Sequence, residues 1–182
     1  EINAKFAKAW GVPSIPSKPG VPLSEVPEAI MEDKIKAFYI MGEDTLQTEP
    51  DINAVKKAFE KVELLIVQDI FMTQTAAEAD ILLPATSCAE HEGVYSAADR
   101  GFQRFYKAIE PTGNVKDDWV IISELATAMG YPMHYNNTKE IWDELRSLCP
   151  IYKGATYEKM EGLCYIQWPC TDEGPEDQGT TY

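Results

Sequence analysis

The chain has 182 residues, of which 45% are hydrophobic, and its 16 basic and 30 acidic side chains give a formal charge of −14 at pH 7. This length and apolar content suffice for one domain of ordinary size with a small appended subdomain. The acidic excess repels phosphate backbones, which argues against nucleic acid as a partner. The longest apolar runs fall far short of the roughly 18 residues that a bilayer span needs, so we expect no direct membrane insertion.

Cysteine usage and the chain start give two further expectations. The four cysteines form no CxxC pair that could begin a zinc or iron-sulfur site, so we expect free thiols, a reducing cytoplasmic compartment and no metal site in this chain. The chain begins at Glu1, without an initiator Met or the apolar core of a signal peptide. We therefore expect a fragment of a longer protein.

The N-terminal region is rich in proline, with five prolines between residues 11 and 27. Each proline fixes φ and removes a backbone donor, which favours an extended segment over a helix or strand. We therefore assign residues 1–36 to a lead-in connector that contributes no core element.

A β-α-β unit follows this connector. Residues 37–41 (AFYIM) have strand composition, and apolar residues at three- and four-residue spacing predict a helix over about 50–61, with Pro50 in its first turn. The apolar run 64–67 predicts a second strand. A helix between two strands predicts that the strands are parallel and joined by a right-handed crossover.

A third strand is expected at 81–83, after a short helical stretch over 73–79 and before Pro84. Continuous apolar runs of this kind are typical of strands buried on both faces. We predict an α/β fold with a doubly wound, mainly parallel sheet flanked by helices, similar to the Rossmann fold. The domain is expected to span residues 37–168.

The second half of the chain predicts a loop-rich stretch over 88–116 and then two amphipathic helices. The first begins at Asp117 or Asp118 and closes at Gly130, and the second runs over 138–148 with Thr138 as its N-cap. Residues 169–182 have almost nothing to bury, so we expect a mobile tail.

Polar loops follow the first two predicted strands, namely Gly42-Glu43-Asp44 and Gln68-Asp69. Ligands of open α/β sheets bind at the carboxyl ends of the strands, and helices after these loops can direct free N–H groups towards a phosphate. A carboxylate such as Asp69 can accept hydrogen bonds from N1–H and the exocyclic amine of guanine. The alternative is that Asp44 and Asp69 only cap the turns that follow them.

Neither histidine predicts a catalytic or metal site. His91 lies between two glutamates and has no second histidine nearby, so we interpret it as a loop imidazole bonded to backbone or ligand. Arg100 and Arg104 form a small basic island that can hold a pyrophosphate or pair with nearby carboxylates. The acidic excess favours the ion-pair interpretation.

Four segments in order resemble the molybdopterin oxidoreductase family, and most of all the large subunit of hydrogenase-linked molybdenum formate dehydrogenases. They are MGED at 41–44, VQDIFMT at 67–73, ADILLP at 79–84 and EHEG through DR at 90–100. The resemblance covers nearly all of the chain from residue 37 onward.

This resemblance implies a domain that binds one guanine dinucleotide of a bis-molybdopterin guanine dinucleotide carrying molybdenum or tungsten. It also implies a [4Fe-4S] cluster in an N-terminal part outside this chain. The cofactor contacts that it implies are Asp44, Gln68, Asp69, His91 and Asp118, and the loop residues Gly42 and Glu43 complete the candidate set. Thr45 stands where many relatives have Pro, and His91 where many have Lys.

The implied parent enzyme oxidises formate to carbon dioxide and passes electrons to an iron-sulfur cluster, while this fragment alone is inactive and contributes no catalytic residue. The expected partners are the rest of the same subunit and iron-sulfur or hydrogenase-type electron-transfer subunits. Two alternatives stay open. One is a pterin-free relative of the NADH dehydrogenase type, and the other is a free-standing guanine-nucleotide-binding module.

Overall fold

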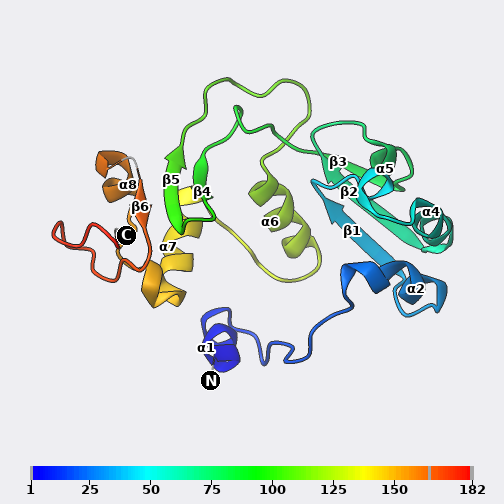
Figure 1. Cartoon of the computed structure of the whole chain (residues 1–182), viewed down its shortest axis with the longest axis horizontal. Coiled ribbons are helices and arrows are strands. Elements are labelled where there is room, and N and C mark those ends of the chain that lie inside the picture. The colour runs from blue at the N-terminus through cyan, green and yellow to red at the C-terminus, as the bar shows by residue number, and fades with distance from the viewer. Residues whose placement is uncertain (1, 164, 181–182) are drawn as a thin grey trace. The chain divides into compact units, whose positions relative to one another are not determined.

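The computed structural model describes residues 2–163 and 165–180, and Figure 1 gives its elements in chain order. Contacts divide the chain into two compact units. The parallel unit comprises Pro16–Ser87 and Pro111–Ile121, and the antiparallel unit comprises Glu1–Ile15, Cys88–Glu110 and Ile122–Tyr182. The expected single domain over 37–168 therefore corresponds to parts of both units.

A three-stranded parallel sheet forms the centre of the parallel unit. Its strands β1 (Ala37–Met41), β2 (Leu64–Asp69) and β3 (Ile81–Pro84) lie in the order β1-β2-β3. The register places Phe38 opposite Leu65 and Val67 opposite Leu82. The predicted α/β class with a parallel sheet flanked by helices is confirmed.

Two helices, α4 (Ile52–Lys61) and α5 (Gln74–Ala77), pack on one face of this sheet. Ile40, Leu65 and Val67, which alternate along their strands and so share a face, are buried against Ala76 of α5, and Phe59 of α4 packs against this cluster. Burial of these side chains is the main term that stabilises the unit.

The lead-in contributes to this core, contrary to the expectation of a connector without core elements. A 3₁₀ turn, η1 (Leu23–Glu25), leads into α2 (Val26–Met31), whose Val26 and Ile30 are buried against Ala58 of α4. Pro27 lies in the first turn of α2, where its missing N–H has no intrahelical partner to lose. The run of prolines therefore precedes and starts a helix.

The antiparallel unit contains a second three-stranded sheet, which the sequence did not predict. Strands β4 (Gly93–Ser96) and β5 (Gly101–Phe105) form a hairpin within the stretch expected to be loop, and β6 (Ile166–Gln167) pairs with β5. Residues 97–100 connect β4 and β5, and Arg100 adopts a positive φ of 69° there. These short strands alternate weakly, so their sequence resembles that of a loop.

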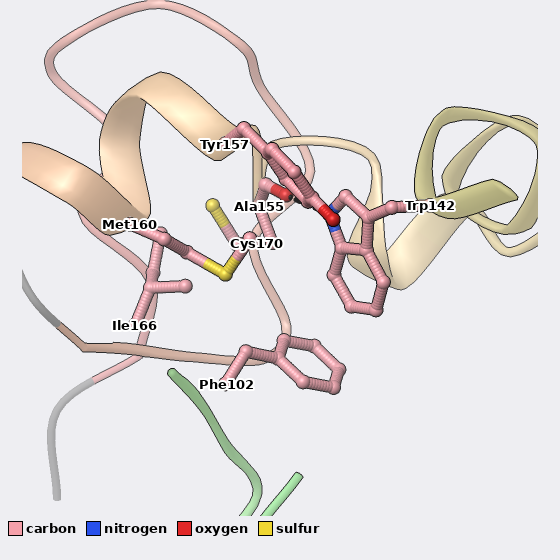
Figure 2. Close-up of a cluster of buried hydrophobic side chains, with 7 residues drawn as sticks. All are labelled: Phe102, Trp142, Ala155, Tyr157, Met160, Ile166 and Cys170. Carbon is pink, nitrogen blue, oxygen red and sulfur yellow. Dashed lines mark hydrogen bonds between the residues drawn. The ribbon is translucent and has the colours of Figure 1, made fainter. Parts of the chain in front are cut away.

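Helices α1 (Ile2–Ala9), α7 (Thr138–Leu148) and α8 (Tyr157–Leu163) and the turn η2 (Pro150–Tyr152) belong to the same unit. The indole Nε1 of Trp142 donates to the carbonyl of Ala155 at 2.6 Å inside the core. Figure 2 shows the cluster around it, made of Phe102, Trp142, Ala155, Tyr157, Met160, Ile166 and Cys170.

The C-terminal segment is held by this unit, contrary to the expectation of a mobile tail. Cys170 is fully buried, and the Asp177 carboxylate accepts from the backbone N–H groups of Thr171 and Asp172 at 2.8 and 2.9 Å. Gly179 bridges to Gln167 of β6. Cys88, Cys149 and Cys170 are free thiols, and Cys164 lies outside the described residues.

Helix α6 (Asp118–Ala128) begins in the parallel unit and ends in the antiparallel unit. Met129, within the predicted helix, lies just beyond the observed one and is 79% exposed. No helix among the described residues is long and apolar enough to cross a membrane.

Two helix starts differ from the prediction by a residue or two. Asp51 caps α4 by accepting from Ala54 N at 3.0 Å, so Pro50 precedes the helix. Asn137, and not Thr138, caps α7 by accepting from Glu140 N at 3.0 Å. Both caps are short side chains, one a carboxylate and one an amide, whose oxygen accepts from the backbone N–H of the third helical residue.

Candidate functional site

The loops after β1 and β2 lie side by side at the carboxyl edge of the parallel sheet. Gly42 N–H donates to the carbonyl of Gln68 at 2.9 Å, which continues the β1–β2 ladder by one residue. Gly42 has a φ of 64°, and no atom lies within 4 Å of the position that a Cβ would take. The backbone at Gly42 therefore faces open space, as close approach by a ligand requires.

Asp44 holds the β1 loop against α5. Its Oδ1 accepts from the backbone N–H of Thr75 at 3.0 Å and from the Thr75 hydroxyl at 2.6 Å, and Gln47 donates to its Oδ2. The hydroxyl of Thr75 lowers the pKa of Asp44 below its ordinary value, with smaller contributions from backbone N–H groups and Gln47. Asp44 thus caps α5 across the sheet edge and makes no capping bond to α3 (Thr45–Thr48).

The N-terminus of α5 is occupied by protein acceptors. Asp44 takes the N–H of Thr75, and the Thr73 hydroxyl takes the N–H of Ala76 at 3.0 Å. Both α3 and α5 are single turns. The expectation that helices after these loops offer free N–H groups to a phosphate is therefore wrong for α5.

Asp69 ends β2 and is half-exposed. Its Oδ1 accepts from the backbone N–H of Ile70 at 2.7 Å and of Phe71 at 3.2 Å. Its Oδ2 has no hydrogen-bond partner among residues 2–163 and 165–180. Asp69 therefore caps the following turn with one oxygen and keeps the other as an acceptor for a ligand, which combines the two interpretations of the sequence.

Gln68 points to the opposite face and is 1% exposed. The Tyr39 hydroxyl donates to its Oε1, and its Nε2 donates to Oδ1 of Asp118 in the first turn of α6. Burial raises the pKa of Tyr39, and the negative charge of Asp118 raises it further. This chain of three side chains fixes the orientation of the Gln68 amide.

The segment before α6 lies beside β3 and places Asp118 at this edge. Ala85 forms a parallel bridge with Lys116, and Thr86 N–H donates to the Lys116 carbonyl at 3.0 Å. Asp117 accepts from the Thr86 hydroxyl at 3.0 Å. Residues far apart in the sequence thus meet where the strands end.

Of the candidate residues, the structure brings together Gly42, Asp44, Gln68, Asp69 and Asp118 within the parallel unit. Glu43 accepts from Thr48 in the same loop. His91 belongs to the antiparallel unit, where its ring stands edge-on to Phe105 at 5.2 Å between centroids. A cofactor role for His91 stays a prediction.

Arg104 makes the ion pairs that the charge balance favoured. Its guanidinium lies 4.0 Å from Glu92 and 3.9 Å from Glu161, and it stacks on Tyr157 at 4.1 Å from the ring centroid. Its side chain is 13% exposed. Arg104 therefore pairs with carboxylates of its own unit, although its buried Nε has no hydrogen-bond partner among the described residues.

Sequence reasoning missed Tyr39 and Thr75. Tyr39 lies in a predicted strand, and a tyrosine in a buried strand needs a partner for its hydroxyl. Thr75 was interpreted as a helix residue, and no local signal indicated that its hydroxyl would meet Asp44, 31 positions away.

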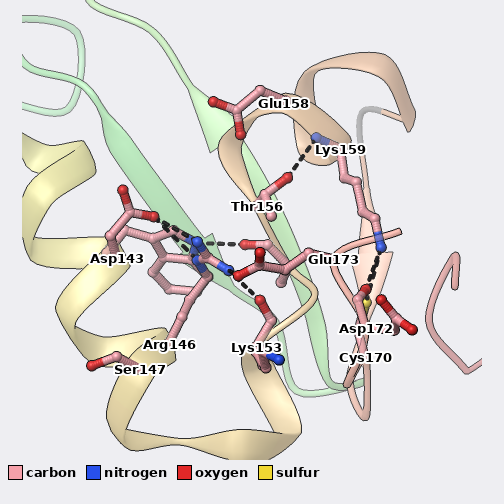
Figure 3. A network of polar contacts seen from close by, with 12 residues as sticks. Asp143, Arg146, Ser147, Lys153, Thr156, Glu158, Lys159, Cys170, Asp172 and Glu173 are labelled. Atoms are coloured by element: carbon pink, nitrogen blue, oxygen red, sulfur yellow. Dashed lines mark hydrogen bonds and ion pairs between the residues drawn. The ribbon is translucent and has the colours of Figure 1, made fainter. Parts of the chain in front are cut away.

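A second polar network, in the antiparallel unit, holds the C-terminal segment (Figure 3). Arg146 donates to Asp143 at 2.8 Å, to the carbonyl of Lys153 and to Glu173 at 3.2 Å. Burial alone would raise the pKa of Asp143, but hydrogen bonds from Lys139 and Arg146 outweigh it and lower the value. Within the described residues, no group of three or more His, Cys, Asp or Glu side chains could hold a metal ion.

Comparison with known proteins shows which family the sequence of this chain matches. Residues 2–128 match the model of the molybdopterin oxidoreductase family. The chain is 64% identical to formate dehydrogenase H of Escherichia coli (strain K12) over 178 residues, which are 98% of this chain and 25% of that protein. It is 39% identical to a probable oxidoreductase of Bacillus subtilis (strain 168) over 97% of this chain and 18% of that protein.

The fold also occurs in a solved structure. Acetylene hydratase from Pelobacter acetylenicus superimposes with a TM-score of 0.69 at 22% identity, covering 92% of this chain and 24% of that one. At this identity the likeness concerns the fold alone. The chain spans about a quarter of the length of the Escherichia coli relative. The match over residues 2–128 shows that this chain belongs to the molybdopterin oxidoreductase family.

Proposed function

We propose that this chain is the dinucleotide-binding part of a molybdenum-dependent formate dehydrogenase large subunit. The proposal is supported by 64% identity to formate dehydrogenase H over nearly the whole chain. It is supported equally by the cluster of polar groups at the carboxyl edge of the parallel sheet, where open α/β sheets bind ligands. The parent subunit oxidises formate to carbon dioxide in the cytoplasm.

The observation that carries the proposal is the uncommitted Oδ2 of Asp69. Guanine presents N1–H and an exocyclic amine on one edge, and a carboxylate accepts from both, whereas adenine offers no such pair of donors. Because Oδ1 is held by two backbone N–H groups, the carboxylate is oriented before a ligand arrives. The residues present therefore fit a guanine dinucleotide.

The other candidate residues hold the loops and the helix start around Asp69 in place. Asp44 anchors the β1 loop to Thr75, and Gln68 holds Asp118 at the start of α6. Gly42 leaves the space beside the strand ends open. When bound, the molybdenum cofactor supplies the two-electron redox chemistry, while these side chains bind and orient it.

The partners follow from the same proposal. A cluster-bearing region of the subunit and an iron-sulfur or hydrogenase-type electron-transfer subunit accept the electrons. The strongly acidic surface of this chain, with a formal charge of −14, favours basic patches on such partners.

The proposal is tested in the full-length subunit by replacing Asp69 with Asn. The side-chain carbonyl oxygen of Asn can still accept from the backbone N–H groups of the turn. Its NH2 group, however, is a donor and stands where guanine needs an acceptor. We expect the guanine nucleotide released by acid hydrolysis and the molybdenum content by mass spectrometry both to fall about tenfold or more. Asp51→Asn, which alters the α4 cap, is the matched control.

Normal molybdenum and guanine content in Asp69→Asn would contradict the assigned role of Asp69. A wild-type subunit without any guanine nucleotide would contradict the proposed function itself and would favour the pterin-free relative.

A further inference from the structure

The turn after β2 displays three consecutive apolar side chains. Ile70, Phe71 and Met72 are 48%, 72% and 70% exposed. Single exposed apolar residues are ordinary on protein surfaces, but three in succession beside a carboxylate form a patch that is typical of a contact site.

This turn is ordered at both ends. Asp69 Oδ1 accepts from the backbone N–H groups of Ile70 and Phe71, and Thr73 N–H donates to the Phe71 carbonyl at 3.0 Å. The Thr73 hydroxyl then caps α5 by accepting from Ala76 N. The backbone that carries Phe71 is therefore fixed, and the exposure of its ring follows from the turn geometry and not from a frayed end.

The free acceptor beside this patch indicates what covers it. A wholly apolar surface laid over Ile70, Phe71 and Met72 would bury the adjacent Asp69 carboxylate with Oδ2 unpaired, at a large desolvation cost. A planar heteroaromatic ring with donors on its edge covers the apolar side chain with its face and satisfies Oδ2 with its edge. At the neighbouring strand end, no atom lies within 4 Å of the position that a Cβ of Gly42 would take.

We propose that Phe71 is the stacking surface for the purine ring of the bound dinucleotide, with Met72 as a polarisable neighbour. The inference rests on the proposed function and adds to it a residue that contributes affinity for a planar aromatic base. Stacking on an aromatic side chain tolerates any base, so Phe71 supplies affinity while Asp69 supplies the preference for guanine.

The test uses the full-length subunit with Phe71→Leu, Phe71→Tyr and the control Ile109→Ala, which alters a residue of the antiparallel unit that is 56% exposed. Loss of cofactor is followed during dialysis as guanine nucleotide remaining on the protein. Removal of the aromatic ring is expected to speed the loss about 10- to 100-fold in Phe71→Leu. Phe71→Tyr and Ile109→Ala are expected to match the wild type.

A second variant, Phe71→Trp, reports the contact directly. Its additional tryptophan emission, measured against the wild type, is expected to be quenched in the cofactor-loaded subunit relative to the cofactor-free subunit. Equal emission in both forms, or equal cofactor loss in Phe71→Leu and wild type, would overturn the assignment of Phe71. Either result would leave the proposed function unaffected. The proposed function is contradicted only if the wild-type subunit contains no guanine nucleotide.

Discussion

One oxygen of Asp44 receives two hydrogen bonds from Thr75, one from the backbone N–H at 3.0 Å and one from the hydroxyl at 2.6 Å. The same hydroxyl accepts from the backbone N–H of Leu46 at 3.0 Å. Thr75 is fully buried, so these bonds form without competition from water. The loop after β1 is therefore fastened to the helix after β2 by one side chain.

Thr75→Val keeps the shape of the side chain and removes the hydroxyl. It leaves the Leu46 N–H without its acceptor and Asp44 with one donor fewer, which is expected to lower the free energy of unfolding by about 1–3 kcal/mol. Urea unfolding of the full-length protein measures the change. Thr112→Val, at an exposed loop position, should leave stability unchanged, and equal stability of both variants would show that the hydroxyl contributes nothing.

The stability contributed by Asp44 depends on pH. Because the folded pKa lies below the ordinary value of 3.8, the contribution is complete above that value and is lost as the pH falls through the folded pKa. Asp44→Asn is therefore expected to flatten the loss of stability below about pH 4. Unfolding midpoints at pH 7 and pH 3.5 report it, and an unchanged difference between these midpoints in the variant would argue against the expectation.

Tyr39→Phe removes the donor to the buried Gln68 amide. The orphaned Oε1 is expected to cost about 1–3 kcal/mol of unfolding free energy. The double variant Tyr39→Phe with Gln68→Leu removes both polar groups and is expected to cost less than the sum of the single changes. Strict additivity in this double-mutant cycle would mean that the two side chains do not interact.

Arg146→Lys is expected to loosen the C-terminal segment. A lysine carries one compact charge and cannot reach Asp143, the Lys153 carbonyl and Glu173 in the manner of a planar guanidinium. Limited proteolysis with mass spectrometry should detect faster cleavage within residues 171–180. Lys107→Arg, an exposed change in the same unit, serves as the control, and equal cleavage of both proteins would refute a bracing role for Arg146.

The parallel sheet was predictable because its strands are apolar runs with turn signals at each end, and the βαβ spacing dictates their pairing. The loop residues of the site followed from their position at strand ends. The second sheet was not predictable, since Gly93–Ser96 and Gly101–Phe105 alternate only weakly, and Gly101–Phe105 pairs with a strand more than sixty positions later.

The different roles of the candidate residues could not be predicted from the sequence either. Asp44 and Asp69 occupy similar places after strands, yet all of the carboxylate of Asp44 is bonded internally while Asp69 keeps one oxygen available. The difference depends on Gln47, which lies three positions from Asp44, and above all on Thr75, whose proximity to Asp44 is set by tertiary structure. Local pattern therefore located the site but could not assign its roles.

Each of the two units is built from separate segments of the chain, so the parts of one unit are synthesised at different times. All three strands of the parallel sheet have been synthesised by residue 84, but Gln68 can meet its acceptor only after Asp118 has been synthesised. The intervening residues 88–110 belong to the other unit and wait for β6 at Ile166–Gln167. A nascent chain that ends between residues 84 and 118 would therefore contain every strand of the parallel sheet but not the acceptor of the Gln68 amide.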